Sequence, residues 1–544
     1  MKIIISTFIL LNFTFCFCNA QAPQKIWDSF FDGNLIGKDV SNSVITNSAG
    51  DVFVTGSSFH TFNGGNFTTI KYNAGGTEQW SDHYSNTQAL YNNYGVKLII
   101  DKWQNIYAVG TTALHQGDLA VCKYNSAGRI WAKNYEPYSY TTYDDYGVDI
   151  AVDSVGNFYA NAKVLSPTGN LYDMYIIKCD SAGNKIISEN FSSSSDDDIP
   201  TAISVTPNGS MFALCNSFNF FGTTSNDIFT INYLNNFYHN WESKYNGFGN
   251  DTDYGTCLKA DNSNNTFVCG TTDAGNNNDM VVYKQNQYGT RLWVTTYNGT
   301  ANLNDTAIST MWLPNGFVVV TGKCKETINN ITKDAFVTMV IDSGTIVWTK
   351  KFFGADSLGA IPTQMTADAQ GNIYICGYEI LTGGTTNGCI IKYDSNGNQL
   401  WNITYDAGIN LDDKFNSITL DNSNDILVTG QTFTSATNSN YVTVKFANTA
   451  TAIKENTSLG ISNITAYPNP FSQLTTINFT VDQTSTVIVS IYDLTGKIIS
   501  QTKEQTYSKG NNQLFIPRNN LKNGIYIAEI KTNNAAQKVK LIVQ

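Results

Sequence analysis

Six aspartates recur at one position of a repeated sequence unit, and their type and spacing could do chemistry. The set is Asp39, Asp145, Asp198, Asp253, Asp305 and Asp413, with Asn93 and Ala360 at the two remaining positions. Carboxylates gathered at the mouth of a channel would draw cations or a cationic ligand. The competing interpretation is a strand-start or turn cap that recurs because the unit recurs. We favour the cap, and Ala360 would break a ring in one unit.

Other candidates for chemistry are weaker. Asp196-Asp-Asp198 and Asp251-Thr-Asp253 offer hard oxygen ligands, but neither has the Ca²⁺ loop of about 12 residues with a closing Glu. We therefore expect no cofactor, with Ca²⁺ as the alternative. The four histidines show no metal-binding spacing, no G-x-S-x-G motif occurs, and no catalytic residue is predicted. Tyr138, Tyr140 and Tyr143 could stack on a glycan, although we favour core or rim packing for them.

The repeat determines where these residues stand. One sequence unit is repeated eight times. An aligned position that usually holds lysine recurs from Lys71 to Lys445 with a period of about 53 residues. Each unit holds four short segments rich in apolar and β-branched residues, separated by turn residues. Four antiparallel strands per repeat predict a β-propeller blade, in which the first strand lines the central channel. The fold class is therefore all-β.

The two ends of the repeat array complement each other. The last unit stops at Asn448 without the tryptophan that ends most other units, while Trp27-Asp-Ser-Phe-Phe31 precedes the first complete unit. The N-terminal segment thus predicts the missing strand of the last blade, in an eight-bladed propeller over residues 24–448. A seven-bladed propeller is the alternative, because Asn161-Ala162 and Leu214-Cys215 replace the usual Thr-Gly in the stretch 160–220. The tryptophans are expected to wedge against the next blade.

Composition narrows the class of protein. Of 544 residues only 14% are charged, 42% are hydrophobic and 13% are aromatic, which excludes disorder over most of the chain. The net charge of −11 argues against a nucleic-acid or anionic-membrane partner. Lys2, the apolar run Ile3–Phe17 and the small residues before Gln21 predict a signal peptide over residues 1–20 and no transmembrane segment after its removal. The cysteines that remain are expected to be small buried apolar residues, since equivalent positions on different blades lie too far apart to pair.

A second module follows the repeats. Residues 449–463 are small and polar and predict a linker, and residues 464–544 contain short alternating strands that predict a small Ig-like β-sandwich. Tyr467-Pro468-Asn469-Pro470-Phe471, the Gly496 turn after Tyr492, and Gly524 in Lys-Asn-Gly-Ile-Tyr resemble the C-terminal sorting domain of type IX secretion substrates. Residues 24–448 in turn resemble bacterial β-propeller repeats of the SBBP type, with signatures such as Asp-x-x-Gly-Asn-x-Tyr and Lys-Tyr-Asn-x-x-Gly-x-x-x-Trp.

These resemblances imply where the protein is located and what kind of function it has. A sorting domain implies passage through the periplasm and across the outer membrane of a Bacteroidota-type Gram-negative bacterium, with the type IX machinery as partner. The remainder is then released or held at the cell surface. The propeller resemblance specifies the fold and hardly the function. We expect a secreted or surface binding or scaffold protein for an extracellular protein or glycan. The alternative is an extracellular polysaccharide hydrolase or lyase with carboxylates at the channel mouth.

Overall fold

The chain divides into two compact units, residues 1–450 and residues 451–544, and each is described by itself. The computed structural model describes residues 23–33, 37–61, 64–85, 93–112, 118–136, 145–166, 171–193, 197–218, 226–247, 252–275, 277–408, 411–448, 461–493, 497–519, 521–532 and 536–544. The expected signal peptide lies outside these residues. They include no helix that is long and apolar enough to cross a membrane.

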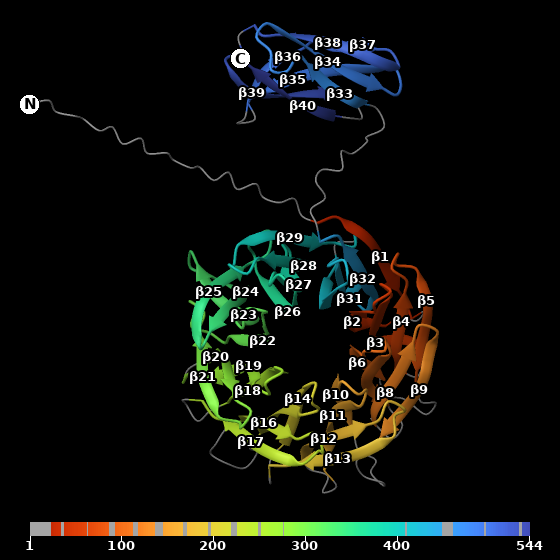
Figure 1. Ribbon diagram of the computed structural model, residues 1–544, viewed down its shortest axis with the longest axis vertical. Coiled ribbons are helices and arrows are strands. Elements are labelled where there is room, and N and C mark those ends of the chain that lie inside the picture. Colours follow the sequence, from red (N-terminus) through yellow and green to blue (C-terminus); the bar gives the residue numbers. More distant parts are fainter. Residues whose placement is uncertain are drawn as a thin grey trace, which may run out of the picture. The chain divides into compact units, whose positions relative to one another are not determined.

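The described residues of the first unit form eight four-stranded antiparallel sheets, which follow one another around a ring (Figure 1). The first strand of each sheet lies on the inside of the ring and the fourth at the rim. The first four sheets are β2 (Val40–Thr46), β3 (Val52–Thr61), β4 (Gly64–Tyr72) and β5 (Glu78–Tyr84); β6 (Tyr94–Ile100), β7 (Ile106–Thr112), β8 (Asp118–Asn125) and β9 (Gly128–Tyr135); β10 (Tyr146–Val152), β11 (Phe158–Leu165), β12 (Tyr172–Cys179) and β13 (Lys185–Phe191); β14 (Asp197–Val205), β15 (Met211–Phe218), β16 (Asp227–Tyr233) and β17 (His239–Tyr245).

The stretch 160–220, where the repeat signature is weakest, thus folds into sheets of the same form. The remaining sheets are β18 (Tyr254–Ala260), β19 (Thr266–Asp273), β20 (Asn278–Gln285) and β21 (Arg291–Tyr297); β22 (Thr306–Trp312), β23 (Val318–Ile328), β24 (Ile331–Asp342) and β25 (Thr345–Phe352); β26 (Ala360–Ala367), β27 (Ile373–Ile380), β28 (Thr386–Tyr393) and β29 (Gln399–Tyr405); and β30 (Asp413–Leu420), β31 (Ile426–Ser435) and β32 (Asn438–Phe446) with β1 (Lys25–Phe31).

The ring is closed by its own N-terminal strand, as the sequence predicted. Strand β1 pairs antiparallel with β32, so the last sheet has the order β1-β32-β31-β30. Side chains of β1 also bond the first sheet. Trp27 Nε1 donates to the Ala74 carbonyl at 3.0 Å, and Ser29 Oγ donates to the Gly76 carbonyl at 2.6 Å. One strand therefore joins the two ends of the array.

Six of the eight turns between the first and second strands are held by one Asp or Asn side chain, while Thr206 and Leu313 stand at this position in the other two. Asp153 Oδ1 accepts the backbone N–H groups of Val155 and Asn157 at 3.0 and 2.9 Å, and its Oδ2 accepts the Asn157 side-chain amide. Gly156 closes the turn with φ of +90°, a conformation that L side chains rarely adopt. This bonding explains why Asp and Gly-Asn recur together in the repeat.

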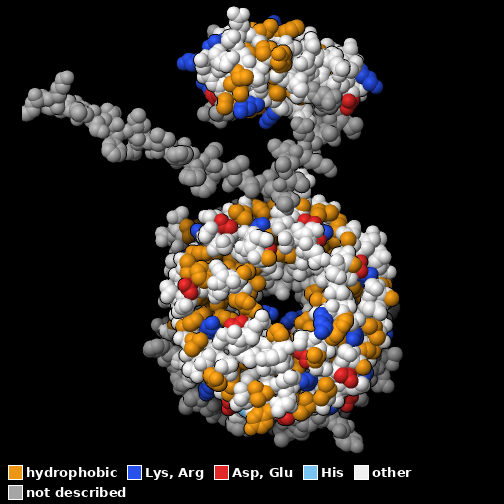
Figure 2. Space-filling view, viewed as in Figure 1, with side chains coloured by type: hydrophobic (Ala, Val, Ile, Leu, Met, Phe, Trp, Pro, Cys, Tyr) orange, Lys and Arg blue, Asp and Glu red, His pale blue; other side chains and the backbone are white. Residues whose placement is uncertain are grey.

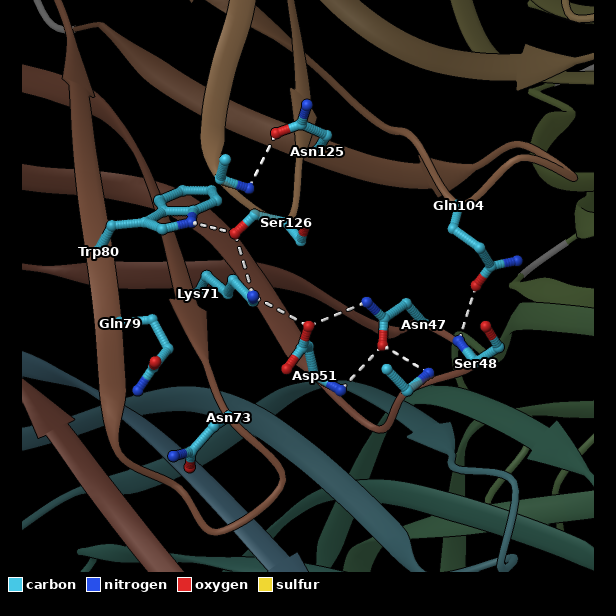
Figure 3. Close-up of polar contacts among 12 residues, drawn as sticks. Asn47, Ser48, Asp51, Lys71, Asn73, Gln79, Trp80, Gln104, Asn125 and Ser126 are labelled. Atoms are coloured by element: carbon cyan, nitrogen blue, oxygen red, sulfur yellow. Dashed lines mark hydrogen bonds and ion pairs between the residues drawn. The ribbon is translucent and has the colours of Figure 1, made fainter.

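Neighbouring sheets are fastened by a contact that we call the lysine–tryptophan clasp (Figure 3). Lys71 Nζ and Trp80 Nε1 both donate to the Ser126 carbonyl in the next sheet, at 3.1 and 3.2 Å, and Lys71 also pairs with Asp51 at 2.9 Å. The carbonyl at the same turn position also accepts from Lys123, Lys178, Trp241 and Trp348. The tryptophans thus lie against the next sheet, as expected, and bond it as well.

A second set of bonds joins the sheets near the channel. Every first strand has a bulge where it faces the second strand. In several sheets the side chain after the bulge accepts a backbone N–H of the next sheet, as those of Ser43, Gln364 and Ser417 do. The backbone N–H of Leu98 donates to Ser43 Oγ at 3.1 Å, and that of Ile418 donates to Gln364 Oε1 at 2.8 Å. These contacts fix the sheets at the inside of the ring while the clasps fix them farther out.

The second unit is a small two-sheet β-sandwich, in line with the predicted fold. Its core includes Phe479, Val489, Ala528 and Leu541. The first strand begins at Ile461, slightly inside the predicted linker. The sheets are β33 (Ile461–Tyr467), β34 (Leu474–Val481) and β38 (Gly510–Pro517); and β36 (Ile498–Gln501), β35 (Ser485–Tyr492), β39 (Gly524–Lys531) and β40 (Ala536–Val543), with β37 (Gln505–Tyr507) paired to β35.

Replacing the clasp lysine should loosen the ring. Lys71→Met leaves the Ser126 carbonyl with one donor fewer and Asp51 without its ion pair. We expect the free energy of unfolding to fall by about 2–3 kcal/mol. Chemical denaturation of the full chain measures it, with Lys102→Met at an exposed turn as the control. Equal effects of the two substitutions would contradict the clasp.

Candidate functional site

The six sequence-selected aspartates do not form an open ring at the channel mouth. Each is buried, with at most 3% of its surface exposed. Five stand at or just before the first strand of a sheet, and Asp198 is the second residue of its strand. Because carboxylates that are buried in this way cannot meet a ligand from solvent, the placement favours the cap interpretation over a cation-drawing ring.

The bonds of these carboxylates show what they do. Asp305 accepts the backbone N–H of Gly299 at 2.5 Å and that of Lys325 at 2.8 Å. Asp39 accepts those of Gly33 and Phe59, both at 2.7 Å. One carboxylate thus ties the segment that enters a sheet to the end of the second strand. The same link from the preceding segment occurs at Asp198, Asp253 and Asp413.

Burial changes the acidity of these groups. Desolvation raises the pKa of Asp198 to about 6, against the opposing effect of hydrogen bonds from Ser193 and Ser217. Desolvation also raises the pKa of Asp253, Asp305 and Asp413, which backbone N–H donors partly offset. The shifts follow from the structural burial of the carboxylates and need no ligand to explain them.

The unit that lacks the aspartate has a substitute that the sequence reasoning missed. Ala360 lies directly opposite Glu379 on β27, where other sheets have Ser217 or Thr432 opposite their aspartate. Glu379 is buried, accepts the backbone N–H of Ala355 at 2.5 Å and bonds Thr404 Oγ1 at 2.5 Å. A carboxylate from the second strand therefore replaces the one missing from the first. The sequence signal that could have revealed this replacement is a glutamate at the second-strand position that faces Ala360.

The metal and glycan candidates from the sequence fall largely outside the residues that the structure describes. Among the described residues, no three His, Cys, Asp or Glu side chains are grouped so that they could hold a metal ion. Asp196, Asp251, Tyr138, Tyr140 and Tyr143 lie outside the described residues.

One edge of the ring carries exposed aromatic side chains. The turns between first and second strands and those between third and fourth strands lie at the same edge of each antiparallel sheet. We call this edge the turn face. It carries Trp103, Tyr238 and Tyr288, which are 53%, 66% and 71% exposed, from three sheets within a run of four. Trp103 lies against Gly156 of the next sheet, and Lys102 Nζ stands 4.5 Å from its ring.

The Tyr-Pro-Asn-Pro-Phe motif of the second unit, residues 467–471, holds the last strand of that unit. The Asn469 amide donates to the Lys540 carbonyl and accepts the Ile542 backbone N–H, each at 2.7 Å. Phe471 enters the core and pairs in parallel with Val543, which also faces Gly524 across β39 and β40. Pro468 and Pro470 are exposed on either side of Asn469, and Tyr467 is 77% exposed. Gly496 lies outside the described residues.

These motifs agree with a family comparison. Residues 465–544 match the secretion system C-terminal sorting domain family. The second unit is a sorting domain. A sorting domain implies interaction with the secretion machinery and export to the cell surface or the medium.

Comparisons over the propeller are distant. No curated protein matches the chain. The β-propeller domain of the trilobed protease from Pyrococcus furiosus is 9% identical with a TM-score of 0.34, covering 61% of this chain and 89% of that one. The α-L-arabinanase from Penicillium chrysogenum is 11% identical with a TM-score of 0.34, covering 59% and 99%. Polysaccharide lyase Uly1 is 11% identical with a TM-score of 0.40, covering 74% and 89%. None of these similarities carries an argument about function.

The stability of the ring should depend on the protonation of Asp198. Its pKa of about 6 when folded exceeds the ordinary 3.8, so the folded state holds the proton more tightly. Stability from this group is therefore present at pH 4 and is lost as the pH rises to 6. The difference in free energy of unfolding between wild type and Asp198→Asn should fall by about 2 kcal/mol from pH 4 to pH 7. Denaturant titrations at several pH values measure it, and a pH-independent difference would contradict the burial of this carboxylate.

Proposed function

We propose that the chain is an exported, non-enzymatic β-propeller that binds extracellular glycan or protein through its turn face. The supporting observation is the set of exposed aromatic side chains Trp103, Tyr238 and Tyr288, which three different sheets present on the turn face. Indole and phenol rings give large contact areas at little entropic cost, and they stack on sugar rings. This favours a glycan, with protein as the other outcome of the test.

The carboxylates support a binding role over catalysis. A polysaccharide hydrolase needs two accessible acids flanking the bond, one to protonate and one to attack or activate water. Here Asp39, Asp198, Asp253, Asp305 and Asp413 are buried and accept backbone N–H groups of the fold. The acids that suggested an enzyme thus act in holding the ring together.

A panel of plant, algal and host glycans tests the binding proposal. We expect the mature chain to retain at least one glycan on an array without producing new reducing ends or unsaturated ends. The double variant Trp103→Ala/Tyr288→Ala should lose about tenfold in affinity.

The matched control is Ile130→Ala/Leu292→Ala, which removes equally exposed apolar side chains from rim strands β9 and β21. Release of sugar ends would establish the hydrolase or lyase alternative. Equal affinity in all variants would rule out the turn face, and capture of a protein in place of a glycan would change the ligand class.

The sorting half of the proposal concerns export by type IX secretion in a Bacteroidota-type bacterium. Deleting residues 464–544 should leave the chain in the periplasm. Asn469→Ala removes two bonds to the last strand, which should cost the sorting domain about 2 kcal/mol and lower the exported fraction.

Asn511→Ala, an exposed asparagine in the same domain, serves as the control and should export normally. Immunoblots of periplasm, cell surface and medium measure all three variants. Normal export after the deletion would overturn the sorting proposal.

A further inference from the structure

Two cysteines face each other on the inner wall of the ring. Cys257 on β18 lies in register with Cys269 on β19. Directly opposed residues of antiparallel strands have Cα atoms about 4.5–5.5 Å apart, which is within the range of about 4.4–6.8 Å that a disulfide spans. All other cysteines of the described residues face residues of another type in their sheets, and all eight are present as free thiols.

Cys257 occupies a special position of its sheet. It is the residue after the bulge, the place from which Ser43, Gln364 and other side chains accept a backbone N–H of the next sheet. Its sulfur accepts the backbone N–H of Thr310 in the same way. It is half-buried whereas Cys269 is fully buried. Figure 2 shows an opening through the middle of the ring, with Lys or Arg side chains at its wall.

The surroundings of Cys257 favour its thiolate. The groups that face it come from four strands: the Cys269 thiol, Lys259 on its own strand, the Thr310 N–H of β22 and Lys97 of β6. The hydrogen bond from Cys269, together with the two lysines and the Thr310 N–H, lowers the pKa of Cys257 against the opposing effect of burial. Burial and the neighbouring sulfur raise the pKa of Cys269. The pair is therefore asymmetric, with one nucleophile and one resolving thiol.

We propose that Cys257 and Cys269 form a dithiol site that exchanges with soluble disulfides and closes to a disulfide bond. The Cys257 thiolate attacks one sulfur of a disulfide RSSR, and one RS⁻ leaves as the mixed disulfide forms. Cys269 then loses its proton and attacks the Cys257 sulfur, which releases the second RS⁻. Two electrons pass from the two cysteines to RSSR, and their two protons end on two RSH molecules. This site is independent of what the turn face binds.

The sheet of β26 and β27 supplies a natural control. There Gln364 takes the place of Cys257, while Cys376 takes that of Cys269. The adjacent threonines are equivalent too: Thr256 Oγ1 lies 3.6 Å from Cys269 Sγ, and Thr363 Oγ1 lies 3.3 Å from Cys376 Sγ. Desolvation by burial raises the pKa of Cys376 to about 12. Cys376 thus occupies the position that corresponds to Cys269 but has no partner thiol. It should therefore not exchange with disulfides.

Glutathione buffers test the proposal on the full mature chain. In oxidised glutathione, mass spectrometry should find the peptides of Cys257 and Cys269 joined, with the loss of two hydrogens. Cys269→Ser should accumulate glutathione on Cys257, because the resolving thiol is missing, and Cys257→Ser should accumulate none on Cys269. In the reduced wild type at pH 7, iodoacetamide should label Cys257 at least about tenfold faster than Cys376.

The wild-type measurements decide the question even where a variant fails to fold. A chain that keeps both thiols free in oxidised glutathione, and that labels Cys257 no faster than Cys376, would overturn the proposal. Glutathione on Cys257 that persists in the wild type would show that Cys269 does not resolve it, which also contradicts the site.

Discussion

In six of the eight sheets, the carbonyl at the second position of the outer turn is the point through which the preceding sheet is held. It receives a lysine ammonium, a tryptophan indole or both from the preceding sheet, as Ser126 does from Lys71 and Trp80. A four-stranded sheet of this kind exposes two apolar faces and needs a neighbour on each side. The clasp fixes that neighbour at the rim, and the bulge contacts, such as that from Leu98 to Ser43, fix it near the channel. An outward rotation of any sheet would break both sets of bonds.

This constraint explains the composition. Most charged residues that the repeat keeps have a partner in the fold, such as Lys445 with Asp421 at 2.7 Å. Five of the six recurring aspartates accept backbone N–H groups at the opposite edge of their sheets, as the favoured cap interpretation expected. In the sheet that lacks the aspartate, Glu379 supplies a carboxylate from the facing strand. The binding that we propose therefore falls to side chains with a large exposed surface, such as those of Trp103 and Tyr288.

Much of the fold could be predicted from the sequence, because the information was periodic. The lysine and tryptophan columns gave the strand order within a unit, and the offset between Trp27 and Asn448 predicted closure by β1. The site could be predicted less well. Column counting identifies which residues recur, but burial depends on where the entering segment crosses the sheet, so the count left the ring and the favoured cap as alternatives. Cys257 escaped notice because it stands in a column of serine, lysine and glutamine, and its partner is apparent only from the register of the bulge.

Hydrogen exchange on the chain without Lys25–Phe31 tests the central claim most directly, since that strand supplies both an edge and a clasp. The ring account predicts that amide protection falls in β32, which loses its partner strand, and also in the first sheet, β2–β5, which loses the contacts of Trp27 and Ser29. Protection that falls in β32 alone, with β2–β5 unchanged, would contradict a ring held by contacts from each sheet to the next.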